Sequence, residues 1–507
     1  MSNTESDALN LSMFRAYDIR TPSAALTPAL AARLARAEAR YFRETLGVPG
    51  VVLAHDARMT GPLYLSIAAD IYAAAGLKVF WLPGVTSTSH FYFTAIQRPE
   101  LAAVMCGASH NPAGDTGRKI LGPGVRPIAE HIGPAGGLDQ IKAFYLEDAS
   151  ASSSPRSSVT AVDNLREYID YSMKLAGVSK GSLAGVRVLH DYLNGAGGRE
   201  MTLAFQQAGA DLRPLHFAAN GHFPLGDPNP VKPEVVAEGR GELESGGYLL
   251  GCFFDGDADR IDVYAGDGQY LSSSFVYAGI LPYIRARFQD REIGVFADLK
   301  SNPLAVIEMA RSGVTVEVMR NGHSQIKDAM FEDQRMIGTV EESAHFYEAF
   351  SLDGRGPYCT ENTLYIALLC ARAWAEDPDR MKRLLEIQAT TSREREWGHF
   401  FPDDDHRTAA MAAVQKHFEA QGTKAISRTR AGMDLDATMM RRGLPFDIDK
   451  ATTLAPDWMQ VCQRISQSEN GLARWEVVAA TPEIAAAARR DVEDVVTQHA
   501  GSPPHRG

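Results

Sequence analysis

An acidic loop follows a short apolar segment near the middle of the chain, and its spacing suits a divalent cation. Residues 248–254 read YLLGCFF, and Asp255, Asp257 and Asp259 come directly after them. Carboxylates at alternate positions can converge when a loop curls, and their hard oxygens are the ligands that Mg²⁺ prefers. Arg260 follows, and its guanidinium could hold a phosphate oxygen. The sequence therefore predicts a magnesium site with an anion-binding arginine beside it.

The acidic loop has two other interpretations. An EF-hand needs glycine at its sixth position and glutamate at its twelfth, whereas Arg260 and Gly266 stand there. A solvated acidic turn stays open as the alternative. A binding site is favoured because ligands of α/β proteins bind at the carboxyl ends of strands.

A serine lies in a similar place after another apolar segment. Residues 101–106 read LAAVMC, and Gly107-Ala108-Ser109-His110-Asn111-Pro112 follows. Asn-Pro is typical of a turn, so Ser109 is expected where the chain leaves a strand. Its hydroxyl could act as a nucleophile if a cation stabilised the oxyanion, and Lys119 is close enough in sequence to help. The alternative is a turn serine that bonds its own backbone.

Two more polar loops complete the candidate chemistry. Glu341, Ser343 and His345 alternate after residues 335–340, so in an extended loop they would point one way and suit sugar hydroxyls. Near the C-terminus, an arginine-and-hydroxyl set could bind a phosphate dianion; its members are Arg464, Ser466, Ser468 and Arg474. Polar surface loops are the alternative for both.

The elements around these loops alternate between helix-like and strand-like segments. Helices are expected at residues 25–46 and 62–75. Strands are expected at 50–54, 77–82, 101–106, 186–190, 248–254, 292–297, 314–318 and 335–340. Such alternation indicates parallel or mixed α/β sheets. Residues 149–158 are rich in serine and predict a linker.

Composition narrows the class of protein. A chain of 507 residues should form three or four domains at roughly 100–200 residues each. The formal net charge of −12 argues against a nucleic-acid partner. Five scattered cysteines predict a reducing compartment rather than disulfides or zinc. Neither a secretory signal nor a membrane segment is evident, so we expect a cytoplasmic protein.

Together and in this order, the four loops resemble those of the α-D-phosphohexomutase family, the phosphomannomutase/phosphoglucomutase enzymes. FRAYDIR at 14–20 looks like the family's opening motif, and Ser109 in ASHNP matches its phosphoserine. The three aspartates match the metal loop, and EESAH at 341–345 matches the sugar-recognition loop. Supporting matches are GHFP at 221–224, DPNP at 227–230 and GHS at 322–324.

The resemblance implies an α/β protein of four domains around a central cleft, three similar α/β domains followed by a smaller C-terminal α+β domain. The expected ranges are 1–155 with the phosphoserine loop, 156–270 with the metal loop, 271–388 with the sugar-recognition loop, and 389–507 with the phosphate-binding loop.

The resemblance also implies roles for particular residues. Ser109, Arg20, Lys119 and His110 would be catalytic. Ser109, once phosphorylated, and the three aspartates would bind the metal. The residues expected to bind substrate are Tyr17, Arg260, Lys300, His323, Glu341, Ser343, His345, Arg464, Ser466, Ser468 and Arg474.

The implied activity is interconversion of hexose 1-phosphate and hexose 6-phosphate, of mannose, glucose or both, through a bisphosphorylated sugar. Mg²⁺ and a hexose 1,6-bisphosphate activator would be required, and a sugar phosphate would be the partner. The fourth loop departs from the family pattern, since Arg474 comes one residue later than usual. A non-catalytic or altered-specificity sugar-phosphate-binding relative is therefore an alternative, as is a phosphatase using the same serine and metal.

Overall fold

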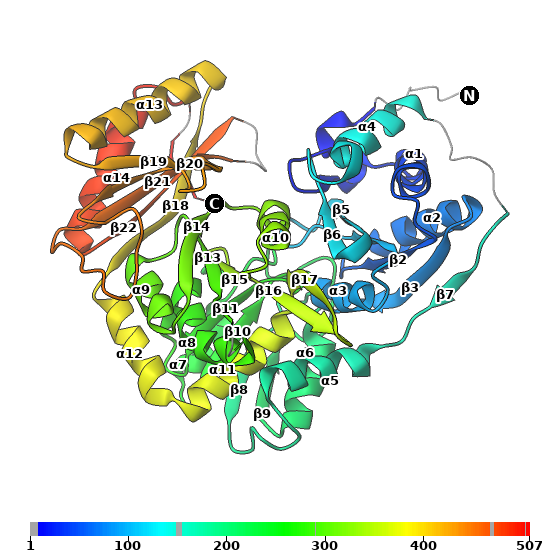
Figure 1. Cartoon of the computed structure of the whole chain (residues 1–507), viewed down its shortest axis with the longest axis horizontal. Coiled ribbons are helices and arrows are strands. Elements are labelled where there is room, and N and C mark those ends of the chain that lie inside the picture. The colour runs from blue at the N-terminus through cyan, green and yellow to red at the C-terminus, as the bar shows by residue number, and fades with distance from the viewer. Residues whose placement is uncertain (1–8, 149–154, 289–290, 467–470, 502, 507) are drawn as a thin grey trace. The chain divides into compact units, whose positions relative to one another are not determined.

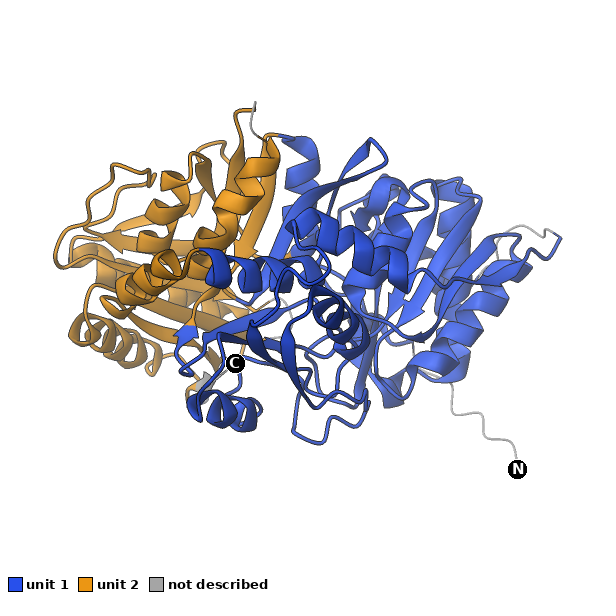
Figure 2. Cartoon of the chain, turned by 90° about the horizontal axis from the view of Figure 1, so that it is seen from below, with its two compact units in different colours: residues 1–270, 323–334, 343–376 blue, residues 271–322, 335–342, 377–507 orange. Residues whose placement is uncertain are grey.

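The computed structural model describes residues 9–148, 155–288, 291–466, 471–501 and 503–506. The chain divides into two compact units, which Figure 2 colours separately. Unit 1 comprises residues 1–270, 323–334 and 343–376, and unit 2 comprises residues 271–322, 335–342 and 377–507. Each unit is described by itself.

The first sheet of unit 1 has seven strands in the order β1-β5-β4-β2-β3-β7, with β6 paired to β5 (Figure 1). Strands β4, β2, β3 and β7 are parallel, while β1 and β6 run antiparallel to β5, and β5 antiparallel to β4. The bounds are β1 Ile19–Pro22, β2 Gly50–His55, β3 Lys78–Val85, β4 Ala102–Cys106, β5 Asp115–Gly122, β6 Arg126–Ile128 and β7 Val159–Ala161.

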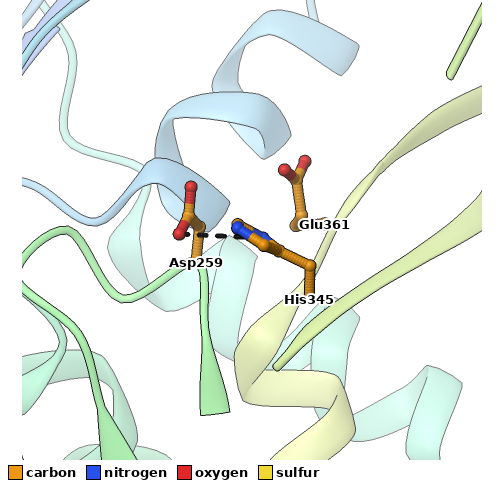
Figure 3. A group of neighbouring side chains, drawn as sticks. All are labelled: Asp259, His345 and Glu361. Atoms are coloured by element: carbon orange, nitrogen blue, oxygen red, sulfur yellow. Dashed lines mark ion pairs between the residues drawn. The ribbon is translucent and has the colours of Figure 1, made fainter. Parts of the chain in front are cut away.

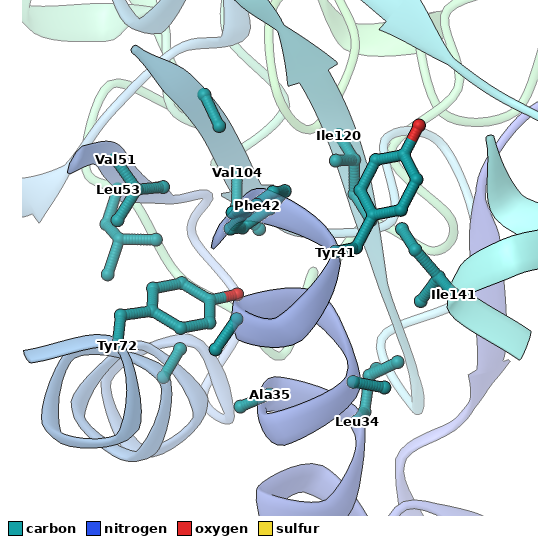
Figure 4. Packing of buried hydrophobic residues seen from close by; sticks show 14 of the residues in the cluster. Leu34, Ala35, Tyr41, Phe42, Val51, Leu53, Tyr72, Val104, Ile120 and Ile141 are labelled. Atoms are coloured by element: carbon teal, nitrogen blue, oxygen red, sulfur yellow. The ribbon is translucent and has the colours of Figure 1, made fainter. Parts of the chain in front are cut away.

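Helices cover both faces of this sheet, and its central strand β2 supplies apolar side chains to each face. All six residues of β2 are buried, and side chains of successive residues point to opposite faces. Val51 and Leu53 pack in the cluster that contains side chains of α1 (Pro28–Arg40), α2 (Gly61–Ala74) and α4 (Leu138–Glu147), part of which Figure 4 shows. Val52 and Ala54 pack on the other face against α3 (Thr88–Ile96).

The second sheet of unit 1 repeats the parallel pattern. Its strands β10, β8 and β9 are parallel, and β11 runs antiparallel to β10. The bounds are β8 Arg187–Asp191, β9 Asp211–Leu215, β10 Leu250–Phe254 and β11 Ile261–Ala265, with helices α5 Leu165–Ala176, α6 Gly198–Ala208 and α7 Ala237–Glu244. The short β12 (Tyr270–Leu271) lies at the boundary between the units.

Three later segments also belong to unit 1. They are α10 (His323–Glu332), the hairpin of β16 (His345–Leu352) and β17 (Arg355–Glu361), and α11 (Thr363–Glu376). Helix α10 contacts β17, and α11 contacts α5 and α6. Residues distant in sequence thus become neighbours of the first two sheets within unit 1.

Unit 2 contains a parallel group and an antiparallel sheet. In the parallel group, β13 (Gly294–Asp298) pairs with β14 (Thr315–Met319) and β15 (Met336–Glu341). Helices α8 (Ser273–Arg285), α9 (Pro303–Arg311) and α12 (Pro378–Ala389) accompany it. The antiparallel sheet has the order β19-β20-β21-β22-β18-β23. Its bounds are β18 Ser392–Phe400, β19 Lys424–Arg428, β20 Asp434–Arg442, β21 Met459–Ile465, β22 Leu472–Ala479 and β23 His505–Arg506.

Helices α13 (Asp404–Ala420) and α14 (Pro482–Val496) pack against the antiparallel sheet in one apolar cluster, which includes Trp397 and Trp475. This arrangement is α+β, as predicted for the C-terminal region. The α/β class is confirmed, and each of the predicted strands overlaps an observed strand.

Some local predictions differ from the structure. The helix predicted at residues 25–46 begins only at Pro28, because Thr27 caps its N-terminus, and a π-type turn replaces it from Tyr41. Residues 149–154 of the predicted linker lie outside the described part of the chain. The segment just after them forms β7, which pairs with β3. The predicted domain boundaries stay predictions. Among the described residues, no helix combines the length and apolar character required to cross a membrane.

Candidate active site

Ser109 lies in the loop that leaves the carboxyl end of β4. Its side chain is almost completely buried, and its backbone adopts a φ of +49°, a conformation that costs a non-glycine residue about 1–3 kcal/mol. The Ser109 Oγ donates a hydrogen bond of 2.7 Å to Asp255 Oδ2. The hydroxyl and the acidic loop, 146 residues apart in sequence, are therefore in direct contact within unit 1.

The acidic loop leaves the carboxyl end of β10 and curls on itself. Asp255 Oδ1 accepts hydrogen bonds of 3.1 Å from the backbone N–H groups of Asp259 and Arg260. Ala258 has a positive φ of 54°. Gly256 lies so close to the serine loop that a Cβ there would be 2.7 Å from the Ser109 carbonyl oxygen. The curl brings together Asp255, Asp257 and Asp259, hereafter the aspartate trio.

The aspartate trio fits a hard divalent cation. One carboxylate oxygen from each aspartate lies within 4.8 Å of the others, and all three residues are buried. Asp257 Oδ1 and Asp259 Oδ1 are buried without a hydrogen-bond partner in the structure, which is costly for carboxylates unless a cation binds them. Burial, together with the charges of the other two aspartates, holds the pKa of Asp255 well above its usual range. A bound cation would favour the ionised form instead.

A second group, Asp259, His345 and Glu361, also gathers possible ligand atoms (Figure 3). Its geometry favours an ion-pair network. Glu361 forms an ion pair of 2.7 Å with Lys327. His345 Nε2 accepts a hydrogen bond of 3.0 Å from Arg260, so in the neutral ring the proton resides on Nδ1. That atom lies 3.8 Å from Asp259 Oδ1, which is too far for a hydrogen bond, and a protonated ring nitrogen cannot bind a metal ion.

Lys119 and Arg20 bring positive charge to the serine and the aspartate trio. The register of β5 places Lys119 opposite Met105 of β4, and its Nζ contacts Asp259 and lies 2.8 Å from Asp257 Oδ2. Burial lowers the pKa of Lys119, but the two aspartates outweigh it and the pKa stands well above its usual range. Arg20 of β1 donates to Asn111 Oδ1 at 2.6 Å and to the Ala108 carbonyl at 3.2 Å. Both side chains are therefore cationic.

Two histidines, one beside the serine and one beside Arg260, are neutral. His110 Nδ1 lies 3.2 Å from Ser109 Oγ. Burial, with the charges of Arg260 and Arg20, holds the pKa of His110 well below its usual range. Burial and Arg260 do the same to the pKa of His345. A neutral imidazole next to the hydroxyl can accept a proton.

Asp56 and Arg58 bind the backbone of the loop that contains Ser109. Neither residue was predicted from the sequence. Arg58 is buried and donates to the carbonyl oxygens of Ser109 at 2.9 Å and Asn111 at 2.7 Å. It also donates to the carbonyls of Pro112 and, at 3.1 Å, Asp115, and to Asp56 Oδ2 at 3.1 Å. These bonds use all five guanidinium N–H groups.

Asp56 also binds the same loop directly. Its Oδ2 accepts a hydrogen bond of 3.0 Å from the Ala108 N–H. The signal that could have revealed both residues is their place directly after β2, which lies beside β4 in the parallel sheet. The carboxyl ends of β2 and β4 therefore meet at one edge.

The predicted sugar-binding residues separate into two groups. In unit 1, the His323 ring lies 6.0 Å from the Tyr17 ring, and Ser343 is half-buried. In unit 2, Glu341 accepts hydrogen bonds from Asn321 Nδ2 at 2.9 Å and from the Gly322 N–H at 3.1 Å. The prediction of an extended loop here is wrong. Residues 342–344 form a turn in which Ala344 has a φ of +71°, so alternation does not determine where these side chains point.

The predicted phosphate-binding residues lie in unit 2. Arg464 of β21 and Arg474 of β22 are direct cross-strand partners, and both contact Glu396 of β18. Lys300, which follows β13, lies 3.8 Å from the same carboxylate. Ser466 is buried just beyond β21, and Ser468 lies outside the described residues. Glu396 was not anticipated from the sequence.

Comparison with known proteins assigns the chain to a family. Residues 11–133 match the sequence model of phosphoglucomutase/phosphomannomutase α/β/α domain I, and residues 166–268 match that of α/β/α domain II. These segments contain the serine loop and the aspartate trio.

Characterised relatives extend the match along the chain. The chain is 27% identical over 434 residues to a phosphomannomutase of Salmonella montevideo, covering 83% of this chain and 89% of that protein. It is 26% identical over 350 residues to a phosphoglucomutase of Neisseria gonorrhoeae, covering 66% and 70% of the two chains.

Solved structures show the same fold. A crystal structure of a phosphoglucomutase/phosphomannomutase family protein from Burkholderia thailandensis superposes with a TM-score of 0.77 at 20% identity, over 98% of this chain and 100% of the other. The ordered loops, the two matched domains and the long relatives agree, and the chain belongs to the phosphoglucomutase/phosphomannomutase family, the α-D-phosphohexomutases.

Proposed function

We propose that this chain is a phosphohexomutase that interconverts hexose 1-phosphate and hexose 6-phosphate by way of a phosphoryl group carried on Ser109. The contact of 2.7 Å between Ser109 Oγ and Asp255 Oδ2 carries the proposal, because it brings a nucleophile and a cation site together. Relatives named phosphomannomutase and phosphoglucomutase support hexose phosphates as substrates. Mannose and glucose phosphates are therefore the first to test.

The aspartate trio and an oxygen of phosphorylated Ser109 would hold Mg²⁺. When bound, the ion withdraws negative charge from the transferring phosphoryl group. Lys119 and Arg20 add fixed positive charge at the same loop. Phosphoryl transfer depends mainly on positioning and charge neutralisation, and these side chains supply both.

The chemical step exchanges one P–O bond for another. A sugar hydroxyl attacks the phosphorus on Ser109, the bond from phosphorus to Oγ breaks, and its electrons remain on Oγ. Neutral His110, whose Nδ1 lies 3.2 Å from Oγ, is proposed to accept the proton of the attacking hydroxyl and then, as the imidazolium, to pass it to Oγ. The product is a hexose bisphosphate and a free serine.

The bisphosphate then turns end for end and returns its other phosphoryl group to Ser109. Tyr17, Arg260, His323, Glu341, Ser343 and His345 are proposed to bind the sugar. Lys300, Arg464, Ser466 and Arg474 are proposed to bind the phosphate that is not transferred, as is Ser468. A chain that has lost its phosphoryl group needs hexose 1,6-bisphosphate as an activator.

A coupled assay tests the proposal. Mannose, glucose and glucosamine 1-phosphates are supplied with Mg²⁺ and hexose 1,6-bisphosphate, and formation of the 6-phosphate is measured. Ser109→Ala should abolish conversion and remove the phosphoryl group from the intact mass. Ser245→Ala, at the exposed end of α7, is the control. Full activity of Ser109→Ala contradicts the proposal, and release of inorganic phosphate without isomerised sugar indicates a phosphatase instead.

A further inference from the structure

The Glu396 carboxylate contacts the cationic side chains that are proposed to bind the non-reacting phosphate. Arg464 donates to both of its carboxylate oxygens, from Nε at 2.8 Å and from Nη2 at 2.9 Å. Arg474 Nη1 lies 3.4 Å from Glu396 Oε2, and Lys300 Nζ lies 3.8 Å from Oε1. All four residues belong to unit 2. A two-pronged arginine contact of this kind is also the geometry in which arginine binds phosphate.

The backbone of β18 has an irregularity at this residue. Glu394 pairs with Val477 and Trp397 pairs with Trp475, so two residues of β18 stand opposite Glu476 alone. A bulge of this kind changes the direction of a side chain and interrupts strand alternation. Glu396 is one of the two inserted residues, and its carboxylate reaches the arginines of β21 and β22.

The two arginines require an anion between them. Arg464 and Arg474 are directly opposite on adjacent antiparallel strands, where like charges are destabilising. Glu476, the other carboxylate nearby, lies 3.3 Å from Arg393 and 4.0 Å from Lys300. Glu396 contacts both arginines, and its carboxylate therefore offsets part of their charge.

The cluster is open to an external anion. About a fifth of the Arg464 and Glu396 side chains is exposed, at 21% and 20%. Burial raises the pKa of Glu396, but Arg464 and Lys300 outweigh it and hold the pKa far below its ordinary value. The carboxylate is thus ionised at neutral pH, and it accepts from Arg464 N–H groups of the kind that a phosphate would need.

We propose that Glu396 is a tethered carboxylate that competes with the substrate's non-reacting phosphate for Arg464 and Arg474 and so sets the affinity for that phosphate. This inference rests on the proposed function, which supplies the phosphate. The competition weakens the hold on each phosphate in turn. It also gives the arginine pair a replacement anion whenever the bisphosphate releases one end in order to turn.

Titration calorimetry with inorganic phosphate tests the competition. Glu396→Gln keeps the size of the side chain and removes its charge, so phosphate should bind about tenfold more tightly than to the wild-type chain. Glu394→Gln is the matched control. It lies two residues away in β18 and pairs with Arg489 at 2.9 Å, so phosphate affinity should not change. Unchanged or weaker binding to Glu396→Gln overturns the proposal.

A second variant keeps the proposal testable if Glu396→Gln does not fold. Glu396→Asp keeps the charge but shortens the side chain, which draws the carboxylate away from the arginine fork. Its phosphate affinity should lie between those of the wild type and Glu396→Gln, and affinity at or below that of the wild type counts against the proposal. In steady-state assays, Glu396→Gln should also lower KM for the sugar phosphate.

The calorimetry needs neither sugar nor turnover, which separates the two hypotheses. If the wild-type chain converts no hexose phosphate but Glu396→Gln binds phosphate more tightly, the proposed function fails and the competition stands. If conversion occurs and phosphate affinity is insensitive to Glu396, only the competition fails.

Discussion

Replacing Arg58 with lysine should loosen the loop that carries Ser109, and it changes no residue that is proposed to bind the substrate. The guanidinium holds four backbone carbonyls of residues 109–115 and the Asp56 carboxylate with its five N–H groups. A lysine ammonium has three donors, so at least two buried acceptors would lose their partner. At about 1–3 kcal/mol for each, the loss is about 2–6 kcal/mol of stability, concentrated in the loop that carries Ser109.

Two measurements separate a local from a general effect. Thermal unfolding reports the stability, and steady-state kinetics of the coupled assay reports kcat and KM. Because Arg58 is buried behind the loop, we expect kcat to fall by two orders of magnitude or more, roughly as a misplaced reacting group does, with KM almost unchanged. Phosphorylation of Ser109, read from the intact mass, should fall as well.

Arg33→Lys is the matched control. Arg33 also donates to backbone carbonyls, those of Tyr145 at 2.7 Å and Leu146 at 2.9 Å, but at the surface, where water can replace the lost bonds. Arg33→Lys should therefore lower the free energy of unfolding by less than about 1 kcal/mol. If Arg58→Lys retained wild-type kcat and stability, the arginine would not position the loop and the reasoning would be refuted.

Three further predictions concern the same unit. Gly256→Ala should lower kcat and reduce the free energy of unfolding by about 1–3 kcal/mol, because its Cβ would lie 2.7 Å from the Ser109 carbonyl oxygen. Gly114→Ala, with nothing within 4 Å of the added atom, is the control. Equal melting temperatures of the two variants would contradict the packing argument. Mg²⁺ should raise the melting temperature, and at a hundredfold excess over Kd it should raise the free energy of unfolding by about 2.7 kcal/mol. A chelator should reverse both changes. If the melting temperature still rises in an Asp257→Asn, Asp259→Asn double variant, the ion binds elsewhere. Burial raises the pKa of Glu200 to about 7 from 4.5, so its stabilising contribution is complete below pH 4.5 and is lost as the pH rises through 7, by about 3 kcal/mol in all. Between pH 5.5 and 8.5 the free energy of unfolding of the wild type should fall by about 2 kcal/mol from this source. Glu200→Gln should lack this part of the fall, and equal falls would exclude Glu200 as its source.

The positions of the two central loops could be predicted because their signals are local. Ser109 and the aspartate trio each follow a strand of buried residues, and such strands predict both their own ends and the loops that carry ligands. The contact between the two loops could not be read from alternation. It depends on Gly256, whose lack of a side chain allows the Ser109 carbonyl to approach.

Other residues escaped prediction for a physical reason. Arg58 binds backbone carbonyls, which carry no signal of residue type, so only the folded loop reveals its partners. Glu396 reaches the arginines through an irregularity in β18, and the SREREWGH segment does not show where alternation breaks. An extended loop was expected from the alternation of Glu341, Ser343 and His345, and Ala344 takes a positive φ that its residue type disfavours, so the turn there carried no signal.

The path of the chain between the two units has a consequence for dissecting the protein. Unit 1 consists of three separate stretches, ending at residues 270, 334 and 376. A fragment truncated at residue 270 would retain the serine loop and the aspartate trio but lack His345, Lys327 and Glu361. A single cut that keeps Asp259 and these three side chains on the N-terminal fragment must fall after residue 361, and that fragment would also carry residues 271–322 and 335–342 of unit 2 without the rest of that unit.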